Sequence, residues 1–106
     1  MLTITRKLAN DILELIKNQI KKAQIITDQA SRTVIITSKV ITDNTESQEL
    51  ILNIELYRND NVSEILQEIQ LYDVQDNLLL KSTNLNIELP SAKIIFVYQI
   101  RLAYRQ

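Results

Sequence analysis

The stretch EIQLYDVQDNLLL, residues 68–80, places apolar residues on both sides of a short polar segment. Such a pattern is typical of two antiparallel strands joined by a tight turn. The turn lacks glycine, and so does the whole chain of 106 residues. Because asparagine and aspartate tolerate a positive φ best after glycine, the predicted turn residues are Asp76 and Asn77, with Asn77 in the left-handed region. The stretch therefore predicts a β-hairpin.

The segments around this hairpin also alternate with a period of two residues. Residues 33–42 are β-branched almost throughout, and residues 49–57 place Leu50, Leu52, Ile54 and Leu56 on one face. Residues 64–73 are predicted to form a strand with Ile65, Ile69 and Leu71 on one face, and residues 78–89 one strand or two short ones. Residues 24–32 are left unassigned, although AQIIT can add a strand.

The last strand, in residues 94–105, has the clearest alternation. One face consists of Ile94, Phe96, Tyr98, Ile100, Leu102 and Tyr104. The other face begins with Ile95 and Val97 and ends charged, at Arg101 and Arg105. This pattern predicts a strand that is buried on both faces at its beginning. The second face is predicted to be covered by another layer of the same chain or by another chain.

The first segment predicts an amphipathic helix over about residues 4–22. Apolar residues recur at three- and four-residue steps, at Leu8, Ile12, Leu15, Ile16 and Ile20. Thr3 or Thr5 is the expected N-cap, and Lys21 and Lys22 are expected in the last turn. A basic amphipathic helix can lie on a membrane, but this one lacks Trp and Phe, so covering the sheet is the favoured interpretation.

Together these elements predict one α+β domain spanning residues 1–106. The N-terminal helix is expected to pack on a mostly antiparallel sheet, or a small β-sandwich, of about five or six strands within residues 33–105. No helix is predicted between strands, which is why the sheet is expected to be antiparallel.

The composition removes most catalytic chemistry. The chain has no His, Cys or Gly, so an imidazole base, a thiolate and a glycine-rich phosphate loop are all excluded. Asp60, Asp73 and Asp76 can bind Ca²⁺ weakly, but Asp is also an ordinary turn residue, which is the favoured interpretation. We therefore predict no enzymatic activity, no catalytic residues, no cofactor and no bound metal.

Charge is distributed unevenly along the chain, although the net charge is only −1. Residues 1–24 carry +3, residues 43–76 carry −8 and residues 77–106 carry +3. Opposed patches suit contacts between subunits, whereas folding can also mix the two signs on one surface, which is the favoured alternative. The low net charge and the absence of a long apolar run lead us to expect no nucleic-acid partner, no membrane partner and no signal peptide.

About a third of the chain resembles the small domains of bacteriophage tail-fibre, collar and baseplate proteins. The resemblance lies in the helix ITRKLANDILELI (4–16), the hairpin EIQLYDVQDNLLLKS (68–82) and the long alternating C-terminal strand. Matching positions are Ile4, Thr5, Leu8, Glu68, Ile69, Leu71, Tyr72, Asp73, Asn77, Leu78 and Leu79. Gln70 and Asp76 stand where that family has glycine.

This resemblance implies a non-enzymatic virion protein of the tail, baseplate or connector, made in the cytoplasm of a bacterial host. It would act as a symmetric homo-oligomer that also binds other virion proteins. The predicted interface residues are Ile95, Val97, Tyr98, Arg101 and Tyr104. Two alternatives stay open: a small adaptor or inhibitor that binds a host protein through a sheet edge, and a nucleic-acid or membrane binder that uses the basic helix.

Overall fold

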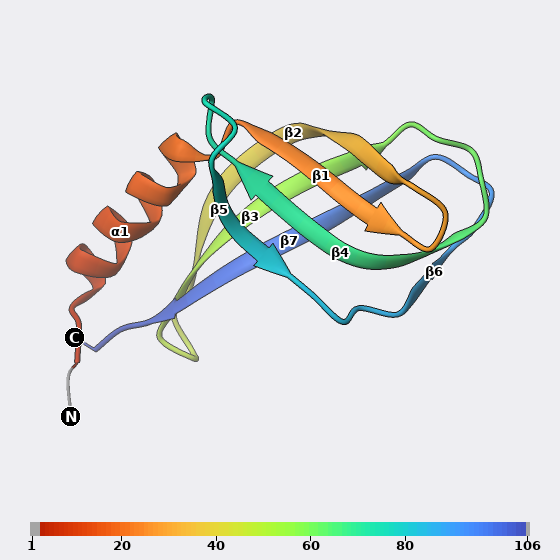
Figure 1. Cartoon of the computed structure of the whole chain (residues 1–106). Helices are drawn as coiled ribbons and strands as arrows, with labels where there is room; N and C mark the ends of the chain where they lie inside the picture. The colour runs from red at the N-terminus through yellow and green to blue at the C-terminus, as the bar shows by residue number, and fades with distance from the viewer. Residues whose placement is uncertain (1–2, 106) are drawn as a thin grey trace.

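A computed structural model describes residues 3–105, and that part of the chain contains one helix and seven strands (Figure 1). The elements follow in the order α1 (Arg6–Gln19), β1 (Lys22–Thr27), β2 (Ser31–Asn44), β3 (Glu49–Arg58), β4 (Glu64–Tyr72), β5 (Leu78–Ser82), β6 (Ile87–Leu89) and β7 (Ile94–Ala103). The predicted α+β class, with an N-terminal helix packed on an antiparallel sheet, is confirmed.

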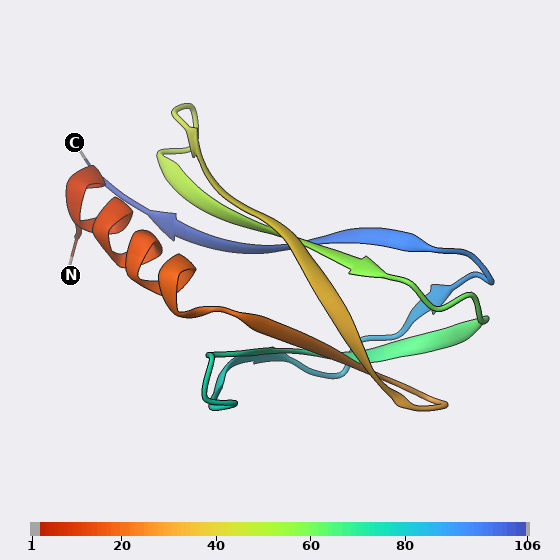
Figure 2. The ribbon, with the colours of Figure 1, turned by 90° about the horizontal axis from the view of Figure 1, so that it is seen from above.

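The strands form a single sheet in the order β5-β4-β1-β2-β3-β7, and β6 pairs with β4 beside β5. All of these strand pairs are antiparallel. Seen from above, the sheet curls into a half-barrel rather than a two-layer sandwich (Figure 2). Of the residues 24–32 that the sequence left unassigned, 24–27 belong to β1, in the middle of the sheet. This additional strand is why the sheet has seven strands instead of the predicted five or six.

The core lies on the concave inner face of the sheet. Leu50, Leu52, Ile54 and Leu56 are at most 1% exposed, so the predicted inward face of β3 is confirmed. In β4 the prediction is wrong at Ile65, because Leu66 is buried instead. The β1–β4 register shifts between Ile26 and Thr27, and this bulge reverses the alternation in the first part of β4.

The helix face that packs on the core is shifted from the predicted one, since Ile16 and Ile20 of the predicted stripe pack inward but Leu8 and Leu15 do not. Thr5 is the N-cap and accepts a hydrogen bond from the Leu8 amide at 3.2 Å. Ala9 and Leu13 are fully buried, whereas Leu8 and Leu15 are 47% and 60% exposed. The small Ala9 side chain lets the helix lie close to the sheet, whereas Leu8 and Leu15 remain outside this contact.

The C-terminal end of α1 also differs from the prediction. The helix ends at Gln19, so Lys21 and Lys22 lie beyond it rather than in its last turn. The Nζ atom of Lys39, on β2, donates instead to the carbonyls of Lys17 and Ile20, at 3.0 and 2.7 Å. A cation from the sheet therefore satisfies the carbonyls at the helix end.

The hairpin between β4 and β5 has a positive φ at Asp76 (65°) and not at Asn77, so that part of the prediction is wrong. The Asp73 and Asn77 backbones are joined at 3.0 Å, which leaves three residues in the loop instead of two. One Asp73 carboxylate oxygen accepts from the amides of Gln75 and Asn77, at 2.9 Å each. A three-residue loop places its left-handed residue last, and here that residue is Asp76.

Candidate interaction surfaces

The carboxylates that were considered for Ca²⁺ are used in local contacts. Asp73 accepts hydrogen bonds within its own turn, and those from Asn77 are the main reason why the pKa of its carboxyl lies below the ordinary value. Asp76 pairs with Lys22 at 2.6 Å, and Asp60 lies 3.6 Å from Arg32. Among residues 3–105 there is no cluster of three or more potential metal ligands. These aspartates therefore act as turn and ion-pair residues.

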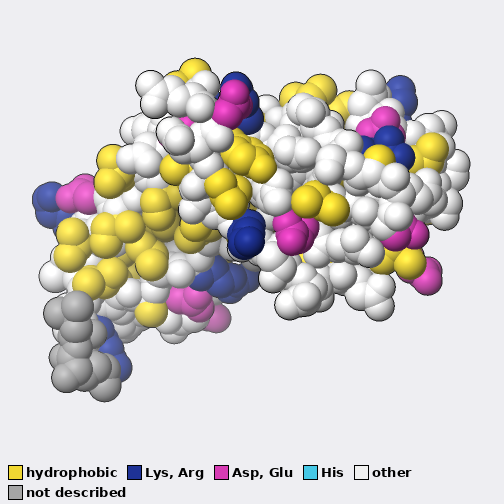
Figure 3. Space-filling view, viewed as in Figure 1, with side chains coloured by type: hydrophobic (Ala, Val, Ile, Leu, Met, Phe, Trp, Pro, Cys, Tyr) yellow, Lys and Arg dark blue, Asp and Glu magenta, His cyan; other side chains and the backbone are white. Residues whose placement is uncertain are grey.

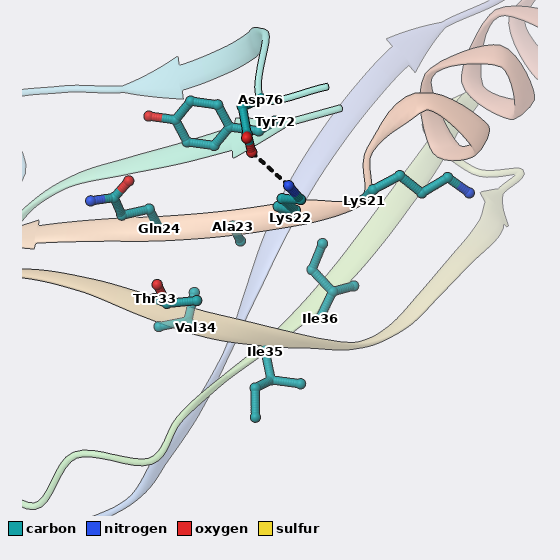
Figure 4. A pocket seen from close by; sticks show the side chains of 10 residues that line it. All are labelled: Lys21, Lys22, Ala23, Gln24, Thr33, Val34, Ile35, Ile36, Tyr72 and Asp76. Carbon is teal, nitrogen blue, oxygen red and sulfur yellow. Dashed lines mark hydrogen bonds and ion pairs between the residues drawn. The ribbon is translucent and has the colours of Figure 1, made fainter. Parts of the chain in front are cut away.

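A pocket of about 510 Å³ lies beside the start of β1 and the β4–β5 turn (Figure 4). Lys21, Lys22, Gln24, Thr33, Tyr72 and Asp76 contribute its polar lining. Figure 4 shows Lys22 directed toward Asp76, and their ion pair uses the charge on both. Both side chains are about half exposed or more. The pocket therefore offers no buried charged group that could bind an anion or activate a substrate.

A buried polar network lies where the β3–β4 and β6–β7 connections meet. The Arg58 guanidinium is fully buried and donates to Glu64 at 2.8 Å. It also donates to the carbonyls of Val62, Pro90 and Ala92, at 3.0, 2.7 and 2.7 Å. All of these partners belong to the same chain, so the network joins two connections and stabilises this end of the sheet.

Glu64 is the anionic centre of this network. Arg32 Nε lies 2.9 Å from both of its carboxylate oxygens, and the Thr27 hydroxyl donates to it at 2.7 Å. Burial raises the pKa of Glu64, but the hydrogen bonds from Thr27, Arg32 and Arg58 together outweigh burial, so its pKa lies below the ordinary value. The carboxylate is therefore held charged between two arginines, in a structural role that the sequence did not predict.

An apolar row crosses three neighbouring strands on the convex outer face of the sheet. Ile35 of β2 faces Tyr57 of β3, and Tyr57 faces Ile95 of β7. We call these three residues the outer row. Ile35 and Ile95 are 54% and 58% exposed, and Val97, next along β7, is 52% exposed. The predicted burial of β7 on both faces is therefore wrong within the chain itself. The outer face of the sheet instead has an exposed apolar strip.

The other predicted interface residues occupy different environments. Tyr98 is on the inner face, where its hydroxyl accepts from Ser82 Oγ at 3.1 Å. Arg101 is on the outer face, with Glu49 at 3.9 Å. Tyr104 is only 3% exposed and donates its hydroxyl to Asp43 at 2.7 Å. Tyr104 is thus part of the core of its own chain.

A second apolar surface lies on α1. Leu8 and Leu15 are exposed, with the half-buried Ile12 between them, and Figure 3 shows hydrophobic side chains gathered over the helix. The basic residues of the helix have nearby carboxylates: Arg6 contacts Asp43 at 2.7 Å, and Lys7 contacts Asp11 at 2.8 Å. These pairs reduce the positive charge available for a nucleic acid or an anionic lipid.

No helix within residues 3–105 has the length and apolar character that crossing a membrane requires. Comparison with protein-family models, curated proteins and solved structures gives no match, so no relative assigns a role to any of these surfaces.

Proposed function

We propose that this chain is a non-enzymatic structural protein of a bacteriophage virion, a component of the tail, baseplate or connector that acts as a symmetric oligomer. The resemblance of the helix and the β4–β5 hairpin to small phage tail domains gives the class of particle. The composition supports the non-enzymatic part, because the chain lacks the residues that most catalytic sites use.

One observation carries the oligomeric part of the proposal. β7 is ten residues long and lies at the edge of the sheet, and the exposed apolar residues Ile95 and Val97 project from its outer face. A long edge strand presents unpaired backbone groups to other chains, and natural monomers usually shorten, charge or cover such an edge. An edge of this kind, next to an apolar strip, is what a subunit of a larger assembly requires.

Two measurements test the proposal. Light scattering over a wide range of concentrations should give a molar mass that is a multiple of 12.3 kDa. Mass spectrometry of phage particles purified on a density gradient should find peptides of this chain in constant ratio to the known tail proteins. A chain that stays monomeric at millimolar concentration and is missing from the particles would refute the proposed function.

The free edge of β7 also favours a second candidate, a small adaptor or inhibitor that binds one host protein by strand addition. Such a protein is expected to be monomeric alone and to form a complex of fixed ratio with its target. A molar mass near 12.3 kDa at all concentrations, together with a stoichiometric complex isolated from host extract, would favour the adaptor over the virion component.

A further inference from the structure

β7 has the features of a strand that pairs with another chain. It pairs with β3 along its full length without a register shift, so it is regular from Ile94 to Ala103. Between residues 94 and 100 it carries no charge, no proline and no glycine, and Arg101 is its single charged residue. Charge and proline are devices that otherwise protect an edge from pairing, and β7 has only the charge of Arg101, near its end.

Among residues 3–105, the chain covers this edge only beyond the end of β7, where the Arg105 amide donates to the Ile4 carbonyl at 2.8 Å. The opposite edge of the curled sheet is β5, with only five residues, and within residues 3–105 it is not paired with β7. The hydroxyls of Ser82 and Tyr98 form a side-chain contact at 3.1 Å between the two edges. Paired strands lie about 4.8 Å apart, and here the Tyr98 side chain spans the distance to Ser82 instead. The backbone groups on the free side of β7 remain open to a partner.

We propose that β7 pairs antiparallel with β7 of a second copy, about a two-fold axis at Tyr98. This inference rests on the proposed oligomeric function and specifies its contact. Residues 94–102 of each copy then face each other. On the inner side, Ile94 faces Leu102, Phe96 faces Ile100 and the two Tyr98 residues face each other. Each of these pairs joins two largely apolar side chains, which stabilises antiparallel strands.

The outer side of the same pairing is also compatible with a second copy. Val97 of one copy faces Gln99 of the other, and Ile95 faces Arg101. The Arg101 side chain is long enough to lay its methylene groups over Ile95 while its guanidinium stays in water. The pairing therefore brings an apolar cover to one end of the outer row.

The charges flanking β7 favour this register over its neighbours. An axis at Val97 would place Lys93 opposite Arg101, and an axis at Gln99 would place Lys93 opposite Arg105. Like charges directly opposite each other destabilise a pair of strands. The proposed axis sets no two charged residues against each other. It overlaps residues 94–102, as many as an axis at Gln99 and more than an axis at Val97, and a long overlap is needed because small interfaces rarely hold a stable dimer.

A charge test separates edge pairing from other modes of association. The double variant Val97→Lys/Gln99→Lys places two lysines opposite each other twice across the axis. The matched variant Val97→Lys/Gln99→Glu places a lysine opposite a glutamate at the same positions and keeps the same lysine beside Glu55. We expect the first to raise the dissociation constant at least tenfold and the second to associate as the wild type does. Glu55 is the β3 neighbour of Val97, so the lysine at position 97 gains an acidic neighbour and the fold should survive.

A cross-linking test identifies the register. The chain has no cysteine, so an introduced thiol reacts without background. Chains with Val97→Cys and chains with Gln99→Cys, treated with a short thiol-specific linker, should give a covalent dimer when mixed and much less when each is alone. Ile35→Cys, two strands from the edge, is the control and should give none.

The outcomes separate this inference from the proposed function. An oligomer that cross-links through Ile35 and not in the Val97–Gln99 mixture, and that tolerates the two lysines, would overturn the edge pairing and leave the oligomeric function standing. A wild-type chain that light scattering finds monomeric at every concentration would overturn both. Cross-linking confined to the mixture, with dissociation of the two-lysine variant alone, supports the pairing.

Discussion

The substitution Arg58→Met tests whether the buried polar network stabilises the β3–β4 and β6–β7 connections. Methionine has nearly the length of the arginine stem but lacks the guanidinium, so the change removes donors with little loss of volume. Three carbonyls and the carboxylate of Glu64 then lose the hydrogen bonds that Arg58 donates at 2.7–3.0 Å. These acceptors are partly or fully buried, so water replaces the lost donors incompletely.

The expected cost follows from what remains. Removing one partner of a buried ion pair costs about 3–5 kcal/mol, because the other charge is left uncompensated. Arg32 stays in place, 2.9 Å from both oxygens of Glu64, and keeps part of this compensation. We therefore expect a loss near the lower end of that range, about 3 kcal/mol. For a domain with a total stability of about 5–15 kcal/mol, this is a large fraction.

Urea unfolding followed by circular dichroism measures this loss, and Arg101→Met is the matched control. Arg101 is half exposed, 3.9 Å from Glu49, and an exposed pair of this kind contributes about 0–1 kcal/mol. The midpoint should fall clearly for Arg58→Met and hardly at all for Arg101→Met, with equal slopes. Equal midpoints for the two variants would refute the assignment of a stabilising role to the buried network.

Four other predictions concern the turn, acid stability and assembly. Asp76→Gly should be neutral or stabilising in urea unfolding, whereas Asp76→Val should cost about 1–2 kcal/mol and Asn77→Gly should not stabilise. Folding lowers the pKa of Glu64, so below pH 4.5 the unfolded chain binds more protons than the folded chain. The free energy of unfolding should therefore fall as the pH drops below that value. Urea titrations at several pH values should show a less steep fall for Glu64→Gln. Ile95→Lys should keep the wild-type circular dichroism spectrum but lower the molar mass in light scattering, because the proposed pairing sets residue 95 opposite Arg101 of the second copy; unfolding of this variant would contradict the 58% exposure of Ile95. Self-association should change by less than about threefold between 50 and 500 mM NaCl in sedimentation equilibrium, since it relies on backbone and apolar groups; a strong weakening by salt would point to charged patches instead.

The strand pattern could be predicted from the sequence because a period of two residues places every second side chain on one face. β3 and the inner face of β7 follow this rule directly, and their apolar residues lie on the concave side of the sheet. β4 departs from it at Leu66, because a bulge adds one residue and reverses the faces. Such a bulge depends on the pairing with β1, which the local pattern does not contain.

The helix and the turn show what composition and spacing leave undetermined. The predicted apolar stripe of α1 reaches the core at Ile16 and at Ile20, just beyond the helix, whereas Leu8 and Leu15 stay exposed. The rest of the contact is made through Ala9 and Leu13. A hydrophobic pattern does not account for a small residue such as Ala9, which allows the helix to lie close to the sheet. In the hairpin, the Asp73 side chain accepts hydrogen bonds from two backbone amides and stabilises a loop of three residues. The positive φ therefore falls on Asp76 instead of the predicted Asn77.

The Arg58–Glu64 network could not be predicted because its members come from four separated parts of the chain. Thr27 ends β1, Arg32 is the second residue of β2, Arg58 ends β3 and Glu64 begins β4. Only the curled antiparallel topology brings these strand ends together. An arginine or a glutamate at a strand end is more often solvated than buried, so the sequence carries no local signal for the pair.

Folding brings part of the unevenly distributed charge together within the chain. Basic residues from the two ends contact acidic residues from the middle: Arg6 with Asp43, Lys22 with Asp76, and Arg101 with Glu49. These three contacts mix the two signs of charge within one chain. In the assembly that we propose, contact between copies depends on the free side of β7 and on the exposed apolar side chains beside it. This division of roles explains why an edge strand can lack charge over its first seven residues in a chain where 24% of residues are charged.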